Sequence, residues 1–267
     1  MTYCLADLLR VMERLRDPET GCPWDVRQDF HSIVPSTLEE CYELAQAIEH
    51  EDYPHVAEEL GDVLFQVVFY AQLGREQALF DFDTIVDVLV RKLLRRHPHV
   101  FRDGDIEGVV TERASVEAVK HSWEAIKQDE RRNRAQPGVL ADVPVALPAL
   151  PRAQKLQKRA ARVNFDWPDP VAVLAKLEEE IAELRAALAQ EDKAQIADEL
   201  GDILFTAVNL ARKLGLDAEA GLRHANAKFE RRFTAMEIQA NQAGKSLGEY
   251  GPQQLELLWE DAKEAVG

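Results

Sequence analysis

The chain has 267 residues, a formal net charge of −16 and a pI of about 4.9. This negative charge would repel a phosphate backbone, so we do not expect binding to duplex nucleic acid. The three cysteines lack metal-finger spacing, which indicates reduced thiols in a cytoplasmic protein. The apolar stretches are too short to span a bilayer, and the charged N-terminal segment does not resemble a signal peptide.

The first half of the chain shows helical periodicity and few strand signals. Pro35, Ser36 and Thr37 predict the start of a helix, with Ser36 or Thr37 as its N-cap. Residues 49–55 predict a turn, and apolar residues recur at helical spacing across residues 56–71. We therefore expect an antiparallel helical hairpin with flanking helices.

The same pattern returns in the second half of the chain. Residues 37–48 and 56–71 align with 177–188 and 196–211 at an offset of 140 residues, with a turn near 189–194. Further on the offset is 136, which aligns 91–97 with 227–233 and 123–127 with 259–263. The sequence thus predicts an all-α fold of tandem helical-hairpin units. They form an N-terminal domain at 1–134 and a C-terminal domain at 152–267, joined by a Pro-rich linker at 135–151.

Each predicted hairpin carries two pairs of carboxylates spaced three residues apart. This spacing places both members of a pair on one helix face. The pairs lie at similar distances from the turn, so an antiparallel hairpin brings all four to one level. They are Glu40, Glu43, Glu59 and Asp62 in the first unit, and Glu180, Glu183, Glu199 and Asp202 in the second. Crowded carboxylates need a counter-charge, and oxygen ligands without His or Cys indicate Mg²⁺ or Mn²⁺.

A glycine lies between the two acids of the second hairpin helix in each unit, at Gly61 and Gly201. Glycine costs a helix about 1 kcal/mol relative to alanine. We therefore expect a neighbouring helix or ligand to approach closely at these positions. Trp24 and Trp167 are predicted to anchor helix packing.

Basic residues and a tryptophan follow each hairpin. Lys92 precedes Trp123 by 31 residues, and Lys228 precedes Trp259 by the same distance. Lysine and arginine bind phosphate, and an aromatic ring stacks on a base. The sequence lacks glycine-rich phosphate loops, so metal and side chains are expected to hold a nucleotide's phosphates.

The order of these motifs resembles that of the two-domain MazG proteins, which are all-α nucleoside triphosphate pyrophosphohydrolases. The motifs that carry the resemblance are "RLRDPETGCPWD" (14–25), "TLEECYE" (37–43), "EELGDVLFQVVFYAQ" (58–72), "RRHPHVF" (95–101), "RAQKLQKRAA" (152–161), "NFDW" (164–167), "EEEIAE" (178–183), "DELGDILF" (198–205), "NAKFERRF" (226–233) and "LLWEDAK" (257–263). They span almost the whole chain.

The resemblance implies Mg²⁺-dependent hydrolysis of ribo- and deoxyribonucleoside triphosphates to monophosphate and pyrophosphate, in nucleotide-pool housekeeping or stress. It also implies a homodimer in which hairpins from two subunits complete four-helix bundles. No membrane or nucleic acid partner is expected.

The resemblance further implies a catalytic C-terminal unit, whose carboxylates hold the metal. Glu179 would be a further acidic residue there, and either Glu179 or a ligand would take the proton of the attacking water. The substrate-binding residues would be Lys228, Arg232, Trp259 and Lys263, with Lys193 as an addition because Gln195 stands where family members can have a lysine. The N-terminal counterparts are Lys92, Arg96, Trp123 and Lys127. Scaffolding or regulation is expected of the N-terminal unit.

Two other protein classes fit part of the pattern. A ferritin-like di-iron protein would need Glu-x-x-His pairs, but none of the seven histidines falls at the third place of these motifs. A non-catalytic helical module that senses metal and nucleotide stays open as an alternative. Release of pyrophosphate would separate it from an enzyme.

Overall fold

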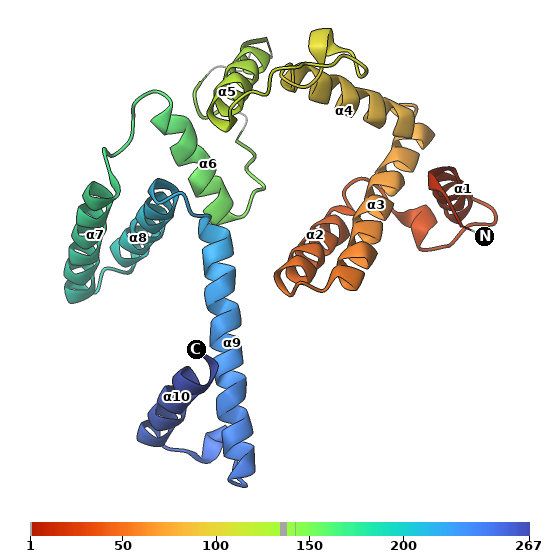
Figure 1. Cartoon of the computed structure of the whole chain (residues 1–267). Helices are drawn as coiled ribbons and strands as arrows, with labels where there is room; N and C mark the ends of the chain where they lie inside the picture. Colours follow the sequence, from red (N-terminus) through yellow and green to blue (C-terminus); the bar gives the residue numbers. More distant parts are fainter. Residues whose placement is uncertain (1, 134–137, 142) are drawn as a thin grey trace. The chain divides into compact units, whose positions relative to one another are not determined.

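The computed structural model describes residues 2–133, 138–141 and 143–267, and it consists of helices and connecting loops (Figure 1). Across these ranges the only β-type pairing is one isolated bridge between Phe101 and Val109. The predicted all-α class is confirmed. No helix in the described ranges is long and apolar enough to cross a membrane.

The chain divides into two compact units, Met1–Arg131 and Arg132–Gly267, here called the N-terminal and C-terminal units. The first half contains α1 (Leu5–Leu15), α2 (Val34–Glu49), α3 (Tyr53–Glu76), α4 (Phe82–Arg96) and α5 (Val116–Asn133). The second half contains α6 (Ala149–Ala161), α7 (Pro170–Gln190), α8 (Lys193–Lys213), α9 (Ala218–Gln242) and α10 (Pro252–Val266). Three short 3₁₀ helices lie at Asp25–Arg27, Arg102–Gly104 and Leu247–Glu249. Within the segment predicted as a linker, residues 135–137 and 142 lie outside the described ranges, and α6 begins at Ala149.

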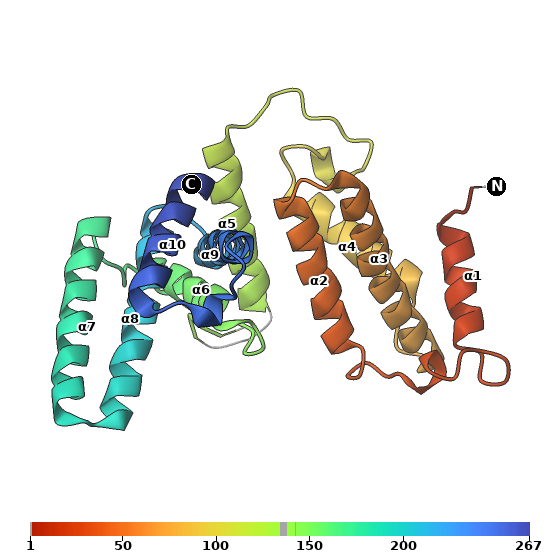
Figure 2. The same ribbon diagram turned by 90° about the horizontal axis from the view of Figure 1, so that it is seen from below.

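Each unit contains an antiparallel hairpin, α2–α3 in one and α7–α8 in the other (Figures 1 and 2). Both hairpin turns have the same construction. Glu51 and Glu191 adopt a left-handed backbone with φ of 55°. The next residues, Asp52 and Asp192, cap the following helix by accepting backbone N–H hydrogen bonds. The turns predicted within 49–55 and 189–194 are confirmed.

The predicted N-cap of α2 is wrong. The helix begins at Val34 with Ile33 as its N-cap residue, and Pro35 lies in the first turn, where its missing N–H leaves no bond unmade. The Thr37 hydroxyl lies 3.0 Å from the Ile33 carbonyl oxygen and 3.0 Å from the Tyr70 hydroxyl. Tyr70 of α3 therefore contacts the Thr37 side chain, which the sequence analysis had assigned to the N-cap of α2.

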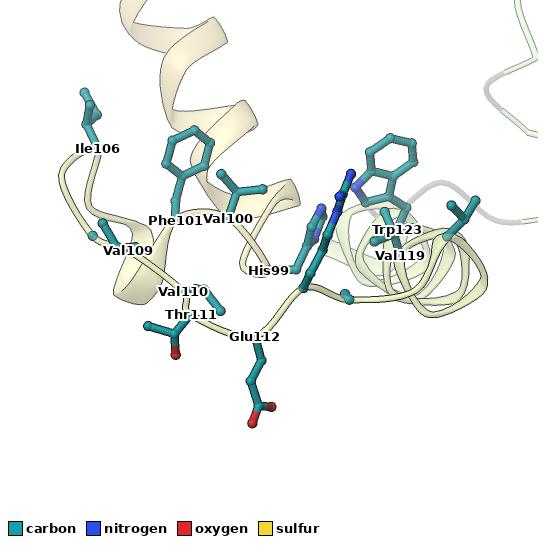
Figure 3. Close-up of a pocket in the computed structure, with 14 residues that line it drawn as sticks. His99, Val100, Phe101, Ile106, Val109, Val110, Thr111, Glu112, Val119 and Trp123 are labelled. Carbon is teal, nitrogen blue, oxygen red and sulfur yellow. The ribbon is translucent and has the colours of Figure 1, made fainter.

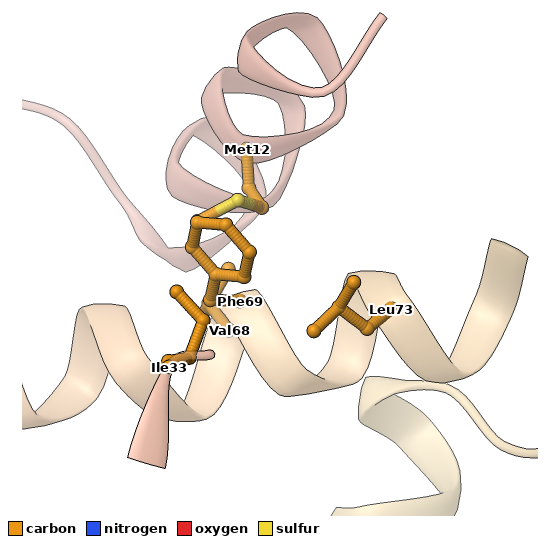
Figure 4. Close-up of a cluster of buried hydrophobic side chains, with 5 residues drawn as sticks. All are labelled: Met12, Ile33, Val68, Phe69 and Leu73. Carbon is orange, nitrogen blue, oxygen red and sulfur yellow. The ribbon is translucent and has the colours of Figure 1, made fainter. Parts of the chain in front are cut away.

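The core of the N-terminal unit lies where α1 crosses α3. Figure 4 shows Met12 of α1 against Phe69 of α3, with Ile33, Val68 and Leu73 around them. All five are almost fully buried, and burial of each such side chain contributes about 1.5 to 3 kcal/mol. This core holds the C-terminal half of α3 in place. The N-terminal half of α3 forms the hairpin with α2.

Trp24 does not belong to this core, because 57% of its surface is exposed. The prediction that Trp24 anchors helix packing is therefore wrong. Arg16 performs that role instead, with its guanidinium 5.2 Å from the centre of the Phe69 ring and 2.6 Å from Glu76 Oε2. It also donates to the Asp25 carbonyl oxygen, so it ties the loop after α1 to α3.

In the C-terminal unit, polar contacts fasten the helices around α8. Gln157 of α6 donates to the carbonyl oxygen of Phe205 at 2.7 Å. Asp166 pairs with Arg212 and with Lys213, whose Nζ lies 2.8 Å from the carboxylate. Lys213 also donates to the carbonyl oxygen of Trp167, which is partly buried. These bonds hold the start of α7 against the end of α8 and so set the register of the hairpin.

Candidate active site

The α7–α8 hairpin brings three of its four predicted carboxylates together. Glu180 from α7 and Glu199 and Asp202 from α8 each offer an oxygen, and these oxygens lie within 4.8 Å of one another. We call these residues the C-terminal acidic cluster. Glu180 is buried, with 5% of its surface exposed, whereas Asp202 faces solvent. The cluster therefore has a closed inner side and an accessible outer side.

Glu183, the fourth predicted carboxylate, is exposed at the edge of the cluster. Partial desolvation by the neighbouring groups raises the pKa of Glu183, and a hydrogen bond with Glu180 and the negative charges of Glu199 and Glu180 raise it further. Lys176 acts in the opposite direction. Glu183 therefore interacts with the charges of the cluster, although it is not one of the three residues that define it.

Lys176 was not predicted to belong to the site. Its Nζ lies 2.8 Å from Glu179 Oε1 and 3.0 Å from Glu180 Oε1, and these bonds raise the pKa of the lysine. The sequence contains the signal, because residues three and four positions apart are neighbours on a helix. The ammonium group supplies positive charge where the carboxylates need a counter-ion.

The α2–α3 hairpin forms a related N-terminal acidic cluster of Glu40, Glu43 and Glu59, again with oxygens within 4.8 Å. Burial raises the pKa of Glu40, and the charges of Asp62, Glu43, Glu59 and Glu39 raise it further. One oxygen of the buried Glu59 lies 2.7 Å from His55 Nε2. Its other oxygen, Oε2, is buried without a hydrogen-bond partner in the described part of the chain.

Both clusters fit a hard divalent cation. Their donors are all carboxylate oxygens, which is the ligand type that Mg²⁺ prefers. The partnerless Oε2 of Glu59 and the position of Lys176 both indicate a need for positive charge. In the C-terminal unit the ion would be held by residues of both hairpin helices, which are Glu180, Glu199 and Asp202.

The predicted phosphate-binding residues gather on α9 and α10. The Arg232 guanidinium carbon lies 5.9 Å and Lys263 Nζ 6.0 Å from the centre of the Trp259 ring. Phe229 packs on Trp259 with 5.5 Å between ring centres. We call Phe229, Arg232, Trp259 and Lys263 the aromatic–cationic cluster. The Arg232 Nε is buried without a hydrogen-bond partner in the ranges that the structure describes, so this cluster offers an unused donor.

Two predicted residues lie outside this cluster. Lys228 is partly buried on α9. Lys193 is exposed at the first position of α8, six residues before Glu199, which is about 9 Å along a helix. No hydrogen bond or ion pair among the described residues joins the C-terminal acidic cluster to the aromatic–cationic cluster.

In the N-terminal unit, Arg96 differs from its counterpart Arg232. It pairs with Glu130 of α5 at 2.5 Å, and Arg95 pairs with the same carboxylate at 2.7 Å. Trp123 packs edge-on against His97 with 5.2 Å between ring centres, and Lys92 is partly buried on α4. The predicted residue Lys127 belongs to α5, but its side chain lies outside the described part of the structure. Glu130 was not predicted.

A cavity of about 660 Å³ lies beside Trp123 in the N-terminal unit (Figure 3). Its lining is mostly apolar and comes from residues 99–116 and from α5, with Val100, Ile106 and Val109 among its members. The sequence analysis did not anticipate it, because the loop that forms it has no counterpart along the continuous helix α9.

The close approach expected at Gly61 and Gly201 is absent within the chain. A Cβ atom built at either position would meet no described atom within 4 Å. At Gly74, in contrast, a Cβ atom would lie 2.6 Å from the Phe80 ring. The expectation that another helix of the same chain approaches closely at Gly61 and Gly201 is therefore wrong.

Comparison with known proteins finds one family domain in both halves of the chain. The MazG nucleotide pyrophosphohydrolase domain matches the chain twice, at residues 28–101 and 169–235. The nucleoside triphosphate pyrophosphohydrolase of Escherichia coli K12 is 48% identical over 258 residues, covering 96% of this chain and 95% of that protein.

The nucleoside triphosphate pyrophosphohydrolase/pyrophosphatase MazG of Thermotoga maritima is 41% identical over 257 residues, covering 96% of this chain and 94% of the relative. Among solved structures, a mazG-related protein from Thermotoga maritima aligns with a TM-score of 0.39 at 25% identity. That alignment covers 46% of this chain and 99% of the solved one.

Proposed function

Because this chain belongs to the MazG nucleotide pyrophosphohydrolase family, we propose that it hydrolyses ribo- and deoxyribonucleoside triphosphates to the monophosphate and pyrophosphate with Mg²⁺. Family membership identifies a hydrolase of phosphoanhydride bonds. The observation that carries the proposal is the C-terminal acidic cluster, whose three carboxylate oxygens lie within 4.8 Å of one another. Mn²⁺, which takes similar ligands, would substitute.

The roles of the side chains follow from their charge. When bound, Mg²⁺ supplies Lewis-acid stabilisation of the phosphate charge. One carboxylate, Glu179, which is held by Lys176, or Glu183 at the edge of the cluster, accepts the proton of the attacking water.

The other half of the proposed site binds the substrate. Arg232, Lys263 and Lys228 hold the phosphates and stabilise the departing pyrophosphate. The partnerless Nε of Arg232 supports this role. The Trp259 ring offers a stacking surface for the base.

A second copy of the chain completes the proposed site. Leu174, Ile181 and Leu188 recur every seven residues on α7 and are exposed, as are Leu200 and Leu204 on α8. Exposed apolar stripes on both helices of a hairpin are typical of a surface that another protein surface buries. A homodimer in which two hairpins form a four-helix bundle would provide it.

We place the enzyme in the cytoplasm, with a role in nucleotide-pool housekeeping or stress. The three cysteines are free thiols, which is the usual state in a reducing compartment. The net charge of −16 supports a small nucleotide rather than a nucleic acid as the phosphorylated partner.

Product analysis tests the activity. Nucleoside triphosphates incubated with the full chain and Mg²⁺ should yield monophosphate and pyrophosphate. Diphosphate with orthophosphate would contradict the proposed bond, and binding without turnover would identify the sensing module instead. Glu180→Gln should lower kcat by about a hundredfold or more. Glu178→Gln, an exposed neighbour on the same helix, is the matched control and should keep its activity.

A further inference from the structure

We propose that Glu130 acts as a built-in anion that occupies a phosphate-binding site formed by Arg95 and Arg96 in the N-terminal unit. While these ion pairs hold, the N-terminal unit takes no nucleotide. The inference rests on the proposed function, because Arg96 is the counterpart of Arg232, one of the phosphate-binding residues proposed in the C-terminal unit.

Glu130 bonds both arginines at once. Its Oε1 lies 2.7 Å from Arg95 Nη2, and its Oε2 lies 2.5 Å from Arg96 Nη2. The Nε atoms of both guanidinium groups also donate to Oε1, at 3.0 Å and 3.2 Å. The carboxylate is mostly buried, with 15% of its side chain exposed. The two arginines lower the pKa of Glu130 to about 2, so the anion persists at all physiological pH values.

The second copy of the repeat keeps the two arginines but has no acidic residue at the position of Glu130. At the offset of 136 residues that aligns Trp123 with Trp259, the arginine pair becomes Arg231 and Arg232. Glu130 becomes Val266, which carries no charge. Consistent with this exchange, Arg232 Nε is buried without a hydrogen-bond partner in the described ranges. The arginine pair is thus bound to a carboxylate in the N-terminal unit, whereas in the described part of the C-terminal unit Arg232 Nε has no hydrogen-bond partner.

The geometry points to a polyphosphate as the ligand that Glu130 replaces. A carboxylate and a phosphate present similar acceptor oxygens to guanidinium groups. Trp123 lies seven residues before Glu130 on α5, which is two helical turns along one face. Trp123 also lines the cavity of about 660 Å³ in Figure 3, which therefore lies about 10 Å along α5 from Glu130.

Binding to the full chain tests the inference. Glu180→Gln and Glu199→Gln together first remove metal binding in the C-terminal unit. Tripolyphosphate with Mg²⁺ is then titrated calorimetrically into this background and into the same chain with Glu130→Val or Glu130→Gln. Each added change should create about one further site per chain, at least about tenfold tighter than the background. Circular dichroism checks that both variants keep their helices.

Two control variants show whether any gain in tripolyphosphate binding comes from the removal of Glu130. Glu117→Val removes the same charge from an exposed position of the same helix and should create no site. Arg96→Ala, added to Glu130→Val, should abolish the gain. Folded Glu130→Val and Glu130→Gln chains that bind no better than the background would overturn the inference, since Glu130 would then only dock α5.

The reciprocal exchange gives a second readout. Val266→Glu, in an otherwise unchanged chain, should raise KM for nucleoside triphosphate about tenfold, whereas Val266→Gln should not. An unchanged KM in Val266→Glu would count against the inference. If the unmodified chain hydrolyses nucleotides but the Glu130 variants gain nothing, only the inference fails. If the variants gain tripolyphosphate binding but the unmodified chain never releases pyrophosphate, only the proposed function fails.

Discussion

At the scale of single residues, Lys176 shows how the chain itself supplies positive charge to the C-terminal acidic cluster. The ammonium group bonds Glu180, the buried member of the cluster, and Glu179, an exposed neighbour. A lysine in this position and a divalent cation serve the same electrostatic need. The two would therefore share or exchange the carboxylates as metal binds.

Lys176→Met should destabilise the chain in EDTA, because it leaves the buried Glu180 carboxylate without its partner. Saturating Mg²⁺ should reduce this loss, since the ion supplies the missing charge. Thermal denaturation in the two conditions measures both values, with Lys158→Met at an exposed position of α6 as the control. An equal loss with and without Mg²⁺ would show that Lys176 and the ion do not share a site.

The ion pairs of Glu130 predict a particular pH dependence. Its folded-state pKa is lowered from 4.5 to about 2, so its contribution to stability is fully present above about pH 4.5 and is lost as pH falls towards 2. At neutral pH, Glu130→Gln should reduce the free energy of unfolding by on the order of 1 to 2 kcal/mol, allowing for solvent screening at Arg95. The difference between the two chains should vanish near pH 2, as measured by urea denaturation. A difference that is constant with pH would rule out a charge effect.

At the scale of elements, the hairpin turns are short, repeated devices that set the level of the carboxylates. Each combines a left-handed glutamate with a capping aspartate, Glu51–Asp52 and Glu191–Asp192. In the C-terminal unit Asp192 accepts hydrogen bonds from the backbone N–H groups of Ala194 and Gln195 at 3.0 Å and 3.2 Å. The turn thus fixes where α8 begins and, with it, the height of Glu199.

Asp192→Ala should cost about 1 kcal/mol of stability through loss of the N-cap. Glu191→Gly should have the opposite sign and stabilise the fold by up to about 1 kcal/mol, because glycine adopts the left-handed backbone without strain. Chemical denaturation of the two variants beside the unmodified chain gives both values. Destabilisation by Glu191→Gly would mean that the left-handed backbone is not what limits this turn.

The sequence predicted the hairpins and their carboxylates because both depend on local spacing. Helical periodicity, the duplicated turn and the three-residue spacing of the acids place Glu180 beside Glu199 without knowledge of the fold. Thr37 was misassigned because Tyr70, 33 positions away, takes its hydroxyl. Glu130 was missed for the same reason, since its partner Arg96 lies 34 positions away. What sequence alone could not supply was the contacts between distant segments.

At the scale of the whole molecule, duplication has given two units with similar hairpins and different surroundings. The carboxylates recur in both units, but their counter-charges differ. His55 contacts Glu59 in the N-terminal unit, and Lys176 contacts Glu180 in the C-terminal unit. The arginine pairs differ as well, through the exchange of Glu130 and Val266. The repeat keeps its hairpin carboxylates and varies the groups around them.

The exposed leucines of α8 predict the assembly. The full chain should form a dimer of twice the 30.2 kDa chain mass. Leu204→Glu should shift it towards the monomer and lower nucleotide hydrolysis, because a charge in a bundle interface is costly. Light scattering during size-exclusion chromatography measures the mass. Val145→Glu, at another exposed apolar position, is the control and should leave the dimer intact. A Leu204→Glu chain that stays dimeric would place the interface elsewhere.

The distribution of thiols gives the molecule a natural handle for spectroscopy. Cys4, Cys22 and Cys41 all belong to the N-terminal unit, and Cys4 and Cys41 are exposed. Cys41 follows Glu40 directly on α2, so a thiol-reactive fluorophore there would sit beside one acidic cluster and leave the other unlabelled. With Cys4 and Cys22 replaced by serine, such a dye would report ion binding in one half of the repeat while turnover is followed in the other.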